Sequence, residues 1–78
     1  MIYEFYIDGI SIELARQLVG FIESLKSQRY VYLEYRNKGG KKSPTIVKVI
    51  CSREDYHEIF YWLRDKNLKA NVLMNKVK

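Results

Sequence analysis

The chain has 78 residues and a net charge of +5, with 47% apolar and 29% charged residues. This balance is typical of a small folded domain and is too apolar for a disordered tail. No apolar run approaches the roughly 18 residues that a membrane span needs, and the first residues lack the basic and apolar regions of a signal peptide. Because Cys51 is the only cysteine, no internal disulfide can form. We therefore expect a cytoplasmic protein without a membrane partner.

The first half of the chain predicts a strand, a helix and a second strand. Residues 2–7 alternate in the way that a half-buried strand does. Ser11 is a suitable N-cap for the helix that follows, in which apolar residues recur at helical spacing as far as Leu25. Gly20 lies inside this helix and costs about 1 kcal/mol relative to alanine. It marks either a close approach to another backbone or nothing in particular. Residues 30–36 form the second strand.

A hairpin and a second helix are expected next. Residues 37–43 are rich in glycine and lysine, and they connect the second strand to a third at residues 45–51. Ser52 and Asp55 resemble a capping box at the start of the second helix. The apolar stripe of this helix is Tyr56, Ile59, Phe60 and Leu63.

The last part of the chain completes the predicted fold. Asn67 suits a left-handed helix end, and residues 68–74 predict a fourth strand. The order strand, helix, strand, strand, helix, strand indicates an α+β ferredoxin-like βαββαβ sandwich, with two helices packed on one face of a four-stranded antiparallel sheet. We expect one such domain over residues 1–78, in which residues 76–78 are a frayed tail.

Positive charge is concentrated in the middle of the chain. From Lys26 to Lys48 there are seven basic residues and one acidic residue, a net charge of +6, so the rest of the chain has a net charge of −1. Such a block fits either a phosphate-facing patch or a solvated hairpin that keeps the protein soluble.

The sheet face without helices supplies the leading hypothesis for function. Alternation puts aromatic, aliphatic and basic side chains on this open face, and a mixture of this kind tends to be covered by a partner. We expect a non-enzymatic nucleic-acid-binding protein, with single-stranded RNA or DNA favoured, in which bases stack on tyrosines and cations meet phosphates. The predicted contact residues are Tyr6, Tyr30, Tyr32, Arg36, Lys38, Lys41, Lys42 and Lys48.

The alternative hypothesis covers the same face with protein. A compact chain of this size could be an interaction or inhibitor module, regulatory or virus-encoded, that forms a homodimer or binds a protein target. The residues expected at this interface are Tyr32, Ile46, Ile50 and Leu73.

At fold level the layout resembles the RNA recognition motif family. The resemblance is one of topology and could extend over most of the chain. "IYEFYI", residues 2–7, is loosely similar to the first signature of that family, which implies a stacking role for Tyr6 or Tyr3. "TIVKVIC", residues 45–51, departs from the second signature because it contains no aromatic residue. Any base-stacking surface would then rely on the second strand.

Catalytic and cofactor chemistry find little support in the sequence. "GGKKS", residues 39–43, lacks the earlier glycine of a phosphate-binding loop and joins two strands. Cys51 is expected to be a buried apolar side chain, and His57 a surface residue. With Tyr61 and Arg64 it is either an isolated surface group or part of a small protein contact. We expect no catalytic residue, no metal site, no cofactor and no small-molecule substrate.

Overall fold

The computed structural model describes residues 1–36 and 44–75. The predictions made for residues 37–43, among them Lys38, Lys41 and Lys42, and those for residues 76–78 lie outside this range. Within it, the helices and strands follow in the predicted order: β1 (Ile2–Ile7), α1 (Ile12–Glu23), β2 (Tyr30–Glu34), β3 (Thr45–Ile50), α2 (Arg53–Asp65) and β4 (Ala70–Asn75).

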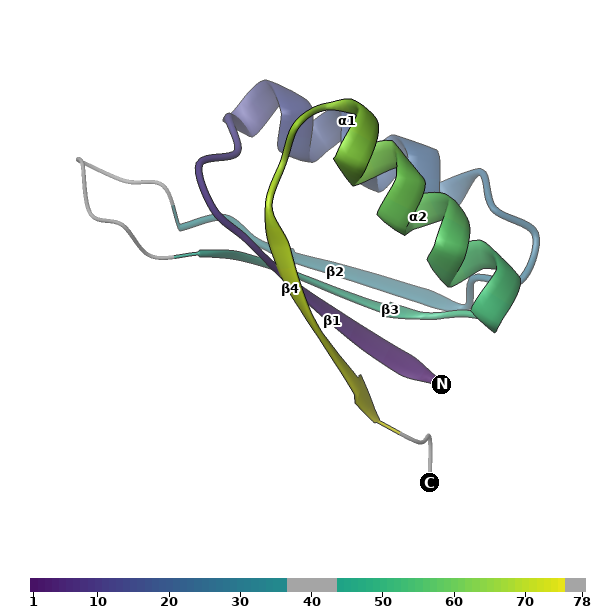
Figure 1. Cartoon of the computed structure of the whole chain (residues 1–78). Helices are drawn as coiled ribbons and strands as arrows, with labels where there is room; N and C mark the ends of the chain where they lie inside the picture. The colour runs from purple at the N-terminus through teal and green to yellow at the C-terminus, as the bar shows by residue number, and fades with distance from the viewer. Residues whose placement is uncertain (37–43, 76–78) are drawn as a thin grey trace.

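The described strands form one antiparallel sheet in the order β2-β3-β1-β4, and both helices lie on the same face of it (Figure 1). The predicted ferredoxin-like α+β fold is therefore confirmed. Its two central strands pair in register, with Phe5 opposite Val47 and Tyr3 opposite Val49. This register puts the alternate residues of β1 and β3 under the helices, where they are shielded from water.

The core lies between the sheet and the two helices. Phe5, Val47 and Val49 have no exposed surface, and the helices cover them with buried apolar residues at the predicted spacing, namely Ala15, Leu18, Ile22, Ile59 and Leu63. One residue of the predicted α2 stripe differs. Phe60 is 42% exposed, because it lies at the flank of the buried stripe of α2.

The helix ends follow local chemistry. Ser11 Oγ accepts a hydrogen bond from Leu14 N at 3.2 Å, which caps α1 as predicted. Asn67 has a φ of 57°, the left-handed conformation expected for it after α2. A Cβ atom built on Gly20 would meet nothing within 4 Å. Gly20 therefore does not mark a close approach to another backbone. Within residues 1–36 and 44–75 no helix has the length and apolar character to cross a membrane.

The open face is formed by cross-strand rows of side chains. One row joins Tyr32, Lys48, Glu4 and Leu73 across β2, β3, β1 and β4. A second row begins at Glu34 and passes through Ile46, and a third contains Ile2, which the sequence analysis did not place on this face.

Candidate functional site

The predicted tyrosines lie on the open face, but one of them is already engaged. Tyr30 and Tyr32 on β2 are 49% and 42% exposed. Tyr6 on β1 is half-buried, and its hydroxyl donates a hydrogen bond to Glu4 Oε2 at 3.0 Å. This hydrogen bond to Glu4 raises the pKa of Tyr6 above its ordinary value of 10.0.

The described cations of the predicted phosphate contact are each paired with an acid of the same face. Lys48 Nζ lies 3.6 Å from Glu4 Oε1, and Arg36 donates a hydrogen bond to Glu34 Oε2 at 3.0 Å. Exposed ion pairs add little stability, but here they put a carboxylate beside each cation that was expected to meet a phosphate. The described part of this face therefore has no net positive charge from these four residues.

The residues predicted for the alternative interface differ in how much of their surface is exposed. Leu73 is 53% exposed on β4, and Ile50 is half-buried on β3. Ile46 is only 8% exposed, so the isolated chain already buries it. Ile46 lies on a central strand, opposite Tyr6 on one side and Glu34 on the other, and it offers a partner little surface.

His57, Tyr61 and Arg64 form one connected cluster on the exposed side of α2. The His57 and Tyr61 rings meet edge to face at 6.4 Å, and the Arg64 guanidinium carbon lies 5.0 Å from the centre of the Tyr61 ring. Phe60 adds a further edge-to-face contact with Tyr61 at 6.2 Å. These exposed residues are thus neighbours and not isolated surface groups.

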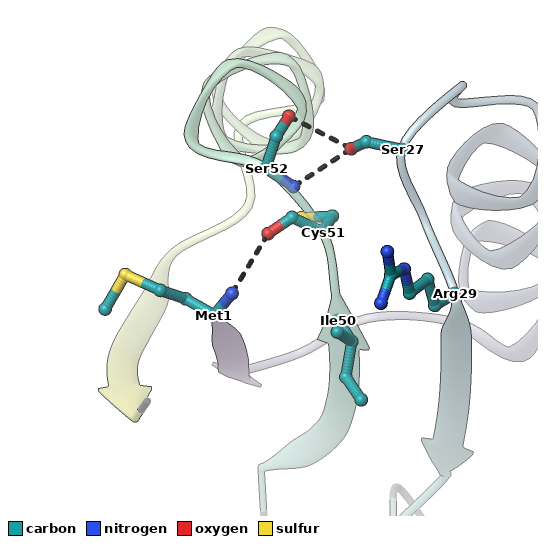
Figure 2. A pocket seen from close by; sticks show the side chains of 6 residues that line it. All are labelled: Met1, Ser27, Arg29, Ile50, Cys51 and Ser52. Carbon is teal, nitrogen blue, oxygen red and sulfur yellow. Dashed lines mark hydrogen bonds between the residues drawn. The ribbon is translucent and has the colours of Figure 1, made fainter. Parts of the chain in front are cut away.

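A cavity of about 360 Å³ lies at the end of the sheet where β2 begins and β3 ends. Figure 2 shows that its walls come from the start of the chain, from the segment before β2, and from the junction between β3 and α2. The lining residues are Met1, Ser27, Arg29, Ile50, Cys51 and Ser52. We refer to it below as the sheet-end cavity.

Backbone hydrogen bonds bring these segments together. Arg29 N donates to Ile50 O at 2.9 Å, which extends the pairing of β2 with β3 to the cavity wall. Cys51 N donates to Met1 O at 3.2 Å, and Met1 N donates to Cys51 O at 3.4 Å. The cavity wall is therefore set by paired backbone and not by loose loops.

Ser27 is the centre of the polar wall. Its hydroxyl oxygen accepts a hydrogen bond from Ser52 N at 2.9 Å, and its hydroxyl group donates to Asp55 Oδ2. Ser27 N donates to the same carboxylate oxygen at 2.9 Å. Ser52 Oγ in turn accepts from Asp55 N at 3.3 Å, as expected of a helix N-cap.

This network corrects the predicted capping box. In a capping box the side chain of the third helical residue accepts from the N-cap backbone amide. Here Ser52 N binds Ser27 Oγ instead, and Asp55 binds Ser27. The α2 N-terminus is thus closed by a residue from the segment between α1 and β2.

Cys51 is buried beside this network. Burial, and then the negative charge of Asp55, raise the pKa of the thiol from its ordinary value of 9.0 to about 11. The thiol is therefore neutral near pH 7, in agreement with the expected role of Cys51 as a small apolar side chain. Among the described residues no three His, Cys, Asp or Glu side chains gather as metal ligands would.

Sequence reasoning missed Ser27 and Arg29 as members of a site. Ser27 lies in a short connection with no motif, and only the folded chain brings it to Ser52, 25 residues away. For Arg29 a signal was present. In a hairpin the start of the second strand lies beside the end of the third, so Arg29 had to face the Ile50–Ser52 segment.

No family model matches the sequence, and a search of curated proteins gives no match either. Solved structures do match in fold. A candidate monooxygenase from Shewanella loihica PV-4 has a TM-score of 0.62 and 15% identity, over 99% of this chain and 93% of its own. SnoaB, a cofactor-independent oxygenase from Streptomyces nogalater, has a TM-score of 0.56 and 8% identity, over 99% and 91%.

A designed protein shares the fold as well. Foldit4, a de novo design, has a TM-score of 0.57 and 20% identity over 99% of this chain and 97% of its own. At these identities the likeness shows the ferredoxin-like fold, and a fold alone does not fix an activity.

The natural neighbours nevertheless overturn the predicted function. Both are named as oxygenases, whereas the sequence favoured a non-enzymatic, nucleic-acid-binding protein or an interaction module of regulatory or viral type. The predictions of a nucleic-acid partner, of an interaction or inhibitor module, of no enzymatic role and of no small-molecule substrate are corrected accordingly. The ion pairs of Lys48 and Arg36 give a physical reason why these residues would not bind phosphates, because each cation already faces a carboxylate.

Proposed function

We propose that this chain is an enzyme of the oxygenase class, which oxidises a small organic molecule with dioxygen in the sheet-end cavity. The observation that carries the proposal is the likeness over almost the whole chain to two natural proteins named as oxygenases. The cavity adds support, since it is concave and combines apolar with polar walls, the usual composition of a small-molecule site.

One reaction of this class needs only a substrate that ionises readily. A molecule with an acidic carbon–hydrogen bond loses a proton, and the resulting anion supplies the electrons that reduce dioxygen. A methylene carbon then becomes a carbonyl and water is released, so that R₂CH₂ and O₂ give R₂CO and H₂O. The enzyme's contribution is to hold the anion in a site of low polarity, where donors aimed at its charge act strongly.

The proposal is tested by oxygen uptake. Purified protein is mixed with a panel of 1,3-diketones and 3-oxo esters, whose methylene groups are acidic, and the rate of oxygen consumption is compared with the uncatalysed rate. Ile50→Trp fills the cavity from its β3 wall and should abolish any catalysed uptake. Leu73→Trp is the matched control, because Leu73 is exposed on β4 and does not line the cavity. Uptake no faster than the uncatalysed rate across the panel would reject the proposal.

We also propose a cytoplasmic location. The support is the single cysteine of the sequence, which is in keeping with a reducing compartment. Fractionation of the cells that make the protein would test it.

A further inference from the structure

The sheet-end cavity has one hydroxyl hydrogen that no other group requires. The Ser27 hydroxyl donates to Asp55 Oδ2, and its oxygen accepts from Ser52 N at 2.9 Å. Ser52 Oγ accepts from Asp55 N at 3.3 Å. A serine hydroxyl has one donor and two acceptor positions. Ser52 Oγ can also accept from the Ser27 hydroxyl at 3.0 Å, so both of its acceptor positions have a donor and its own hydrogen can turn into the cavity.

The second donor at the cavity is Arg29. Within residues 1–36 and 44–75 its guanidinium forms no ion pair and no side-chain hydrogen bond, whereas Arg36 is tied to Glu34. Figure 2 shows the Arg29 side chain on the cavity wall beside Ile50, with its guanidinium on the side of Cys51 and Ser27. The planar guanidinium offers paired donors that match the two oxygens of a carboxylate or an oxyanion.

The charges around the cavity favour an anion. The Asp55 carboxylate does not line it and receives two hydrogen bonds from Ser27. The Cys51 thiol is neutral near pH 7, since its pKa is about 11. Among the described side chains that line the cavity, Arg29 is therefore the only charged one at that pH, and the amino terminus of Met1, which donates to Cys51 O, adds a second positive charge.

The remaining wall of the sheet-end cavity suits the apolar part of a ligand. Ile50 presents its aliphatic side chain on the side away from the serines, whereas the Met1 side chain extends away from the other five residues, and its sulfur contacts the Tyr3 hydroxyl (Figure 2). A ligand that fits both walls has a compact apolar part and one negative group at its edge.

We propose that the substrate of the sheet-end cavity is a small organic acid, bound as its carboxylate or enolate. Its negative oxygen atoms accept hydrogen bonds from the Arg29 guanidinium and the Ser52 hydroxyl, and its apolar part packs on Ile50. That this anion is a substrate rests on the oxygenase function proposed above. Its binding, in contrast, can be measured without turnover.

Sodium benzoate is the probe, and benzamide, which has nearly the same shape without the charge, is its matched comparison. Each is titrated into ¹⁵N-labelled protein. We expect benzoate to shift the amide signals of Ser27, Arg29 and residues 50–52, and to bind about tenfold or more tightly than benzamide, the difference expected of a charge-assisted hydrogen bond.

Three arginine variants complete the test. Arg29→Gln should remove the preference for benzoate, while Arg29→Lys should keep part of it because the charge remains. Arg16→Gln removes an exposed arginine of α1 that does not line the cavity, and should leave binding unchanged.

The inference is overturned if benzoate binds no tighter than benzamide, if the shifted signals lie elsewhere, or if Arg29→Gln binds benzoate normally. The two proposals can fail separately. Benzoate binding without oxygen uptake by any compound rejects the oxygenase function and leaves the anion site. Oxygen uptake without benzoate binding rejects the anion site alone.

Discussion

The rings of Tyr3 and Tyr56 stack with their centres 4.5 Å apart and their planes 8° from parallel. Tyr3 is a buried residue of β1, and Tyr56 lies in the first turns of α2. The contact therefore joins the start of the sheet to the helix that follows the sheet-end cavity, and it holds α2 over β1 at that end.

Replacing Tyr56 with leucine should lower the free energy of unfolding by about 1 kcal/mol, because an aromatic stack contributes roughly 0.5–1.5 kcal/mol beyond the area it buries. Urea unfolding followed by circular dichroism measures the change. Tyr61→Leu on the exposed side of the same helix is the control and should cost less than about 0.5 kcal/mol. Equal losses in the two variants would contradict a special role for the stack.

Ser27→Ala removes the acceptor of Ser52 N and one of the donors to Asp55. We expect unfolding to become easier by about 1–3 kcal/mol, the cost of leaving part-buried polar groups without partners. Thermal unfolding detects a loss of this size. Ser24→Ala is the matched control, since Ser24 is exposed and its hydroxyl donates only to Phe21 O of its own helix. A Ser27→Ala protein as stable as the control would show that the network does not hold α2.

Stability should fall with rising pH in a window set by Cys51. In the unfolded chain the thiol ionises near its ordinary pKa of 9.0, whereas in the folded chain burial and Asp55 raise the pKa to about 11. The contribution of the protonated thiol is complete below pH 9.0 and is lost as the pH rises to about 11. Urea midpoints across this window measure the decline.

Cys51→Ala is the variant that isolates this effect. It should flatten the decline between pH 9.0 and about 11, even if the protein is less stable throughout. A decline above pH 10.0 should remain, because burial also raises the pKa of Tyr3 from its ordinary value of 10.0. An unchanged slope in Cys51→Ala would assign the whole pH dependence to other groups.

Gly20→Ala should stabilise the protein by about 0.5–1 kcal/mol. The position is helical and the new methyl group meets nothing within 4 Å, so the gain comes from the lower backbone freedom of the unfolded chain. Gly9→Ala provides the opposite case, because its φ of 68° is a conformation that alanine adopts only at a cost. It should destabilise by about 1 kcal/mol, and differential scanning calorimetry of the pair would reveal the opposite signs.

The fold could be predicted because local signals agreed with each other. Alternation in β1 and β3, helical spacing in α1 and the cap at Ser11 all indicated the same architecture, and the structure has each of them. Strand and helix ends were less certain, since β2 ends at Glu34 and β4 begins at Ala70, each two residues short of the prediction.

The site could not be predicted in the same way because it depends on contacts between distant residues. Alternation correctly put Ile46 on the open face, but it does not report that Tyr6 and Glu34 flank it and that only 8% of it stays exposed. Counting charges likewise identified Lys48 and Arg36 as candidate phosphate contacts, but it could not show that each forms an ion pair with a glutamate. Each is neutralised by a carboxylate that lies in a neighbouring strand or two residues along the chain.

The hydrogen bonds of the sheet-end cavity have a consequence for folding kinetics. They join residues 50, 28 and 25 positions apart in the sequence, from Met1 to Cys51 and from Ser27 to Asp55 and Ser52. Contacts of such long sequence separation have a large loop-closure entropy cost, which makes them slow to form. We therefore expect the cavity to assemble late, so that a bound ligand would slow unfolding while leaving the early steps of folding unchanged.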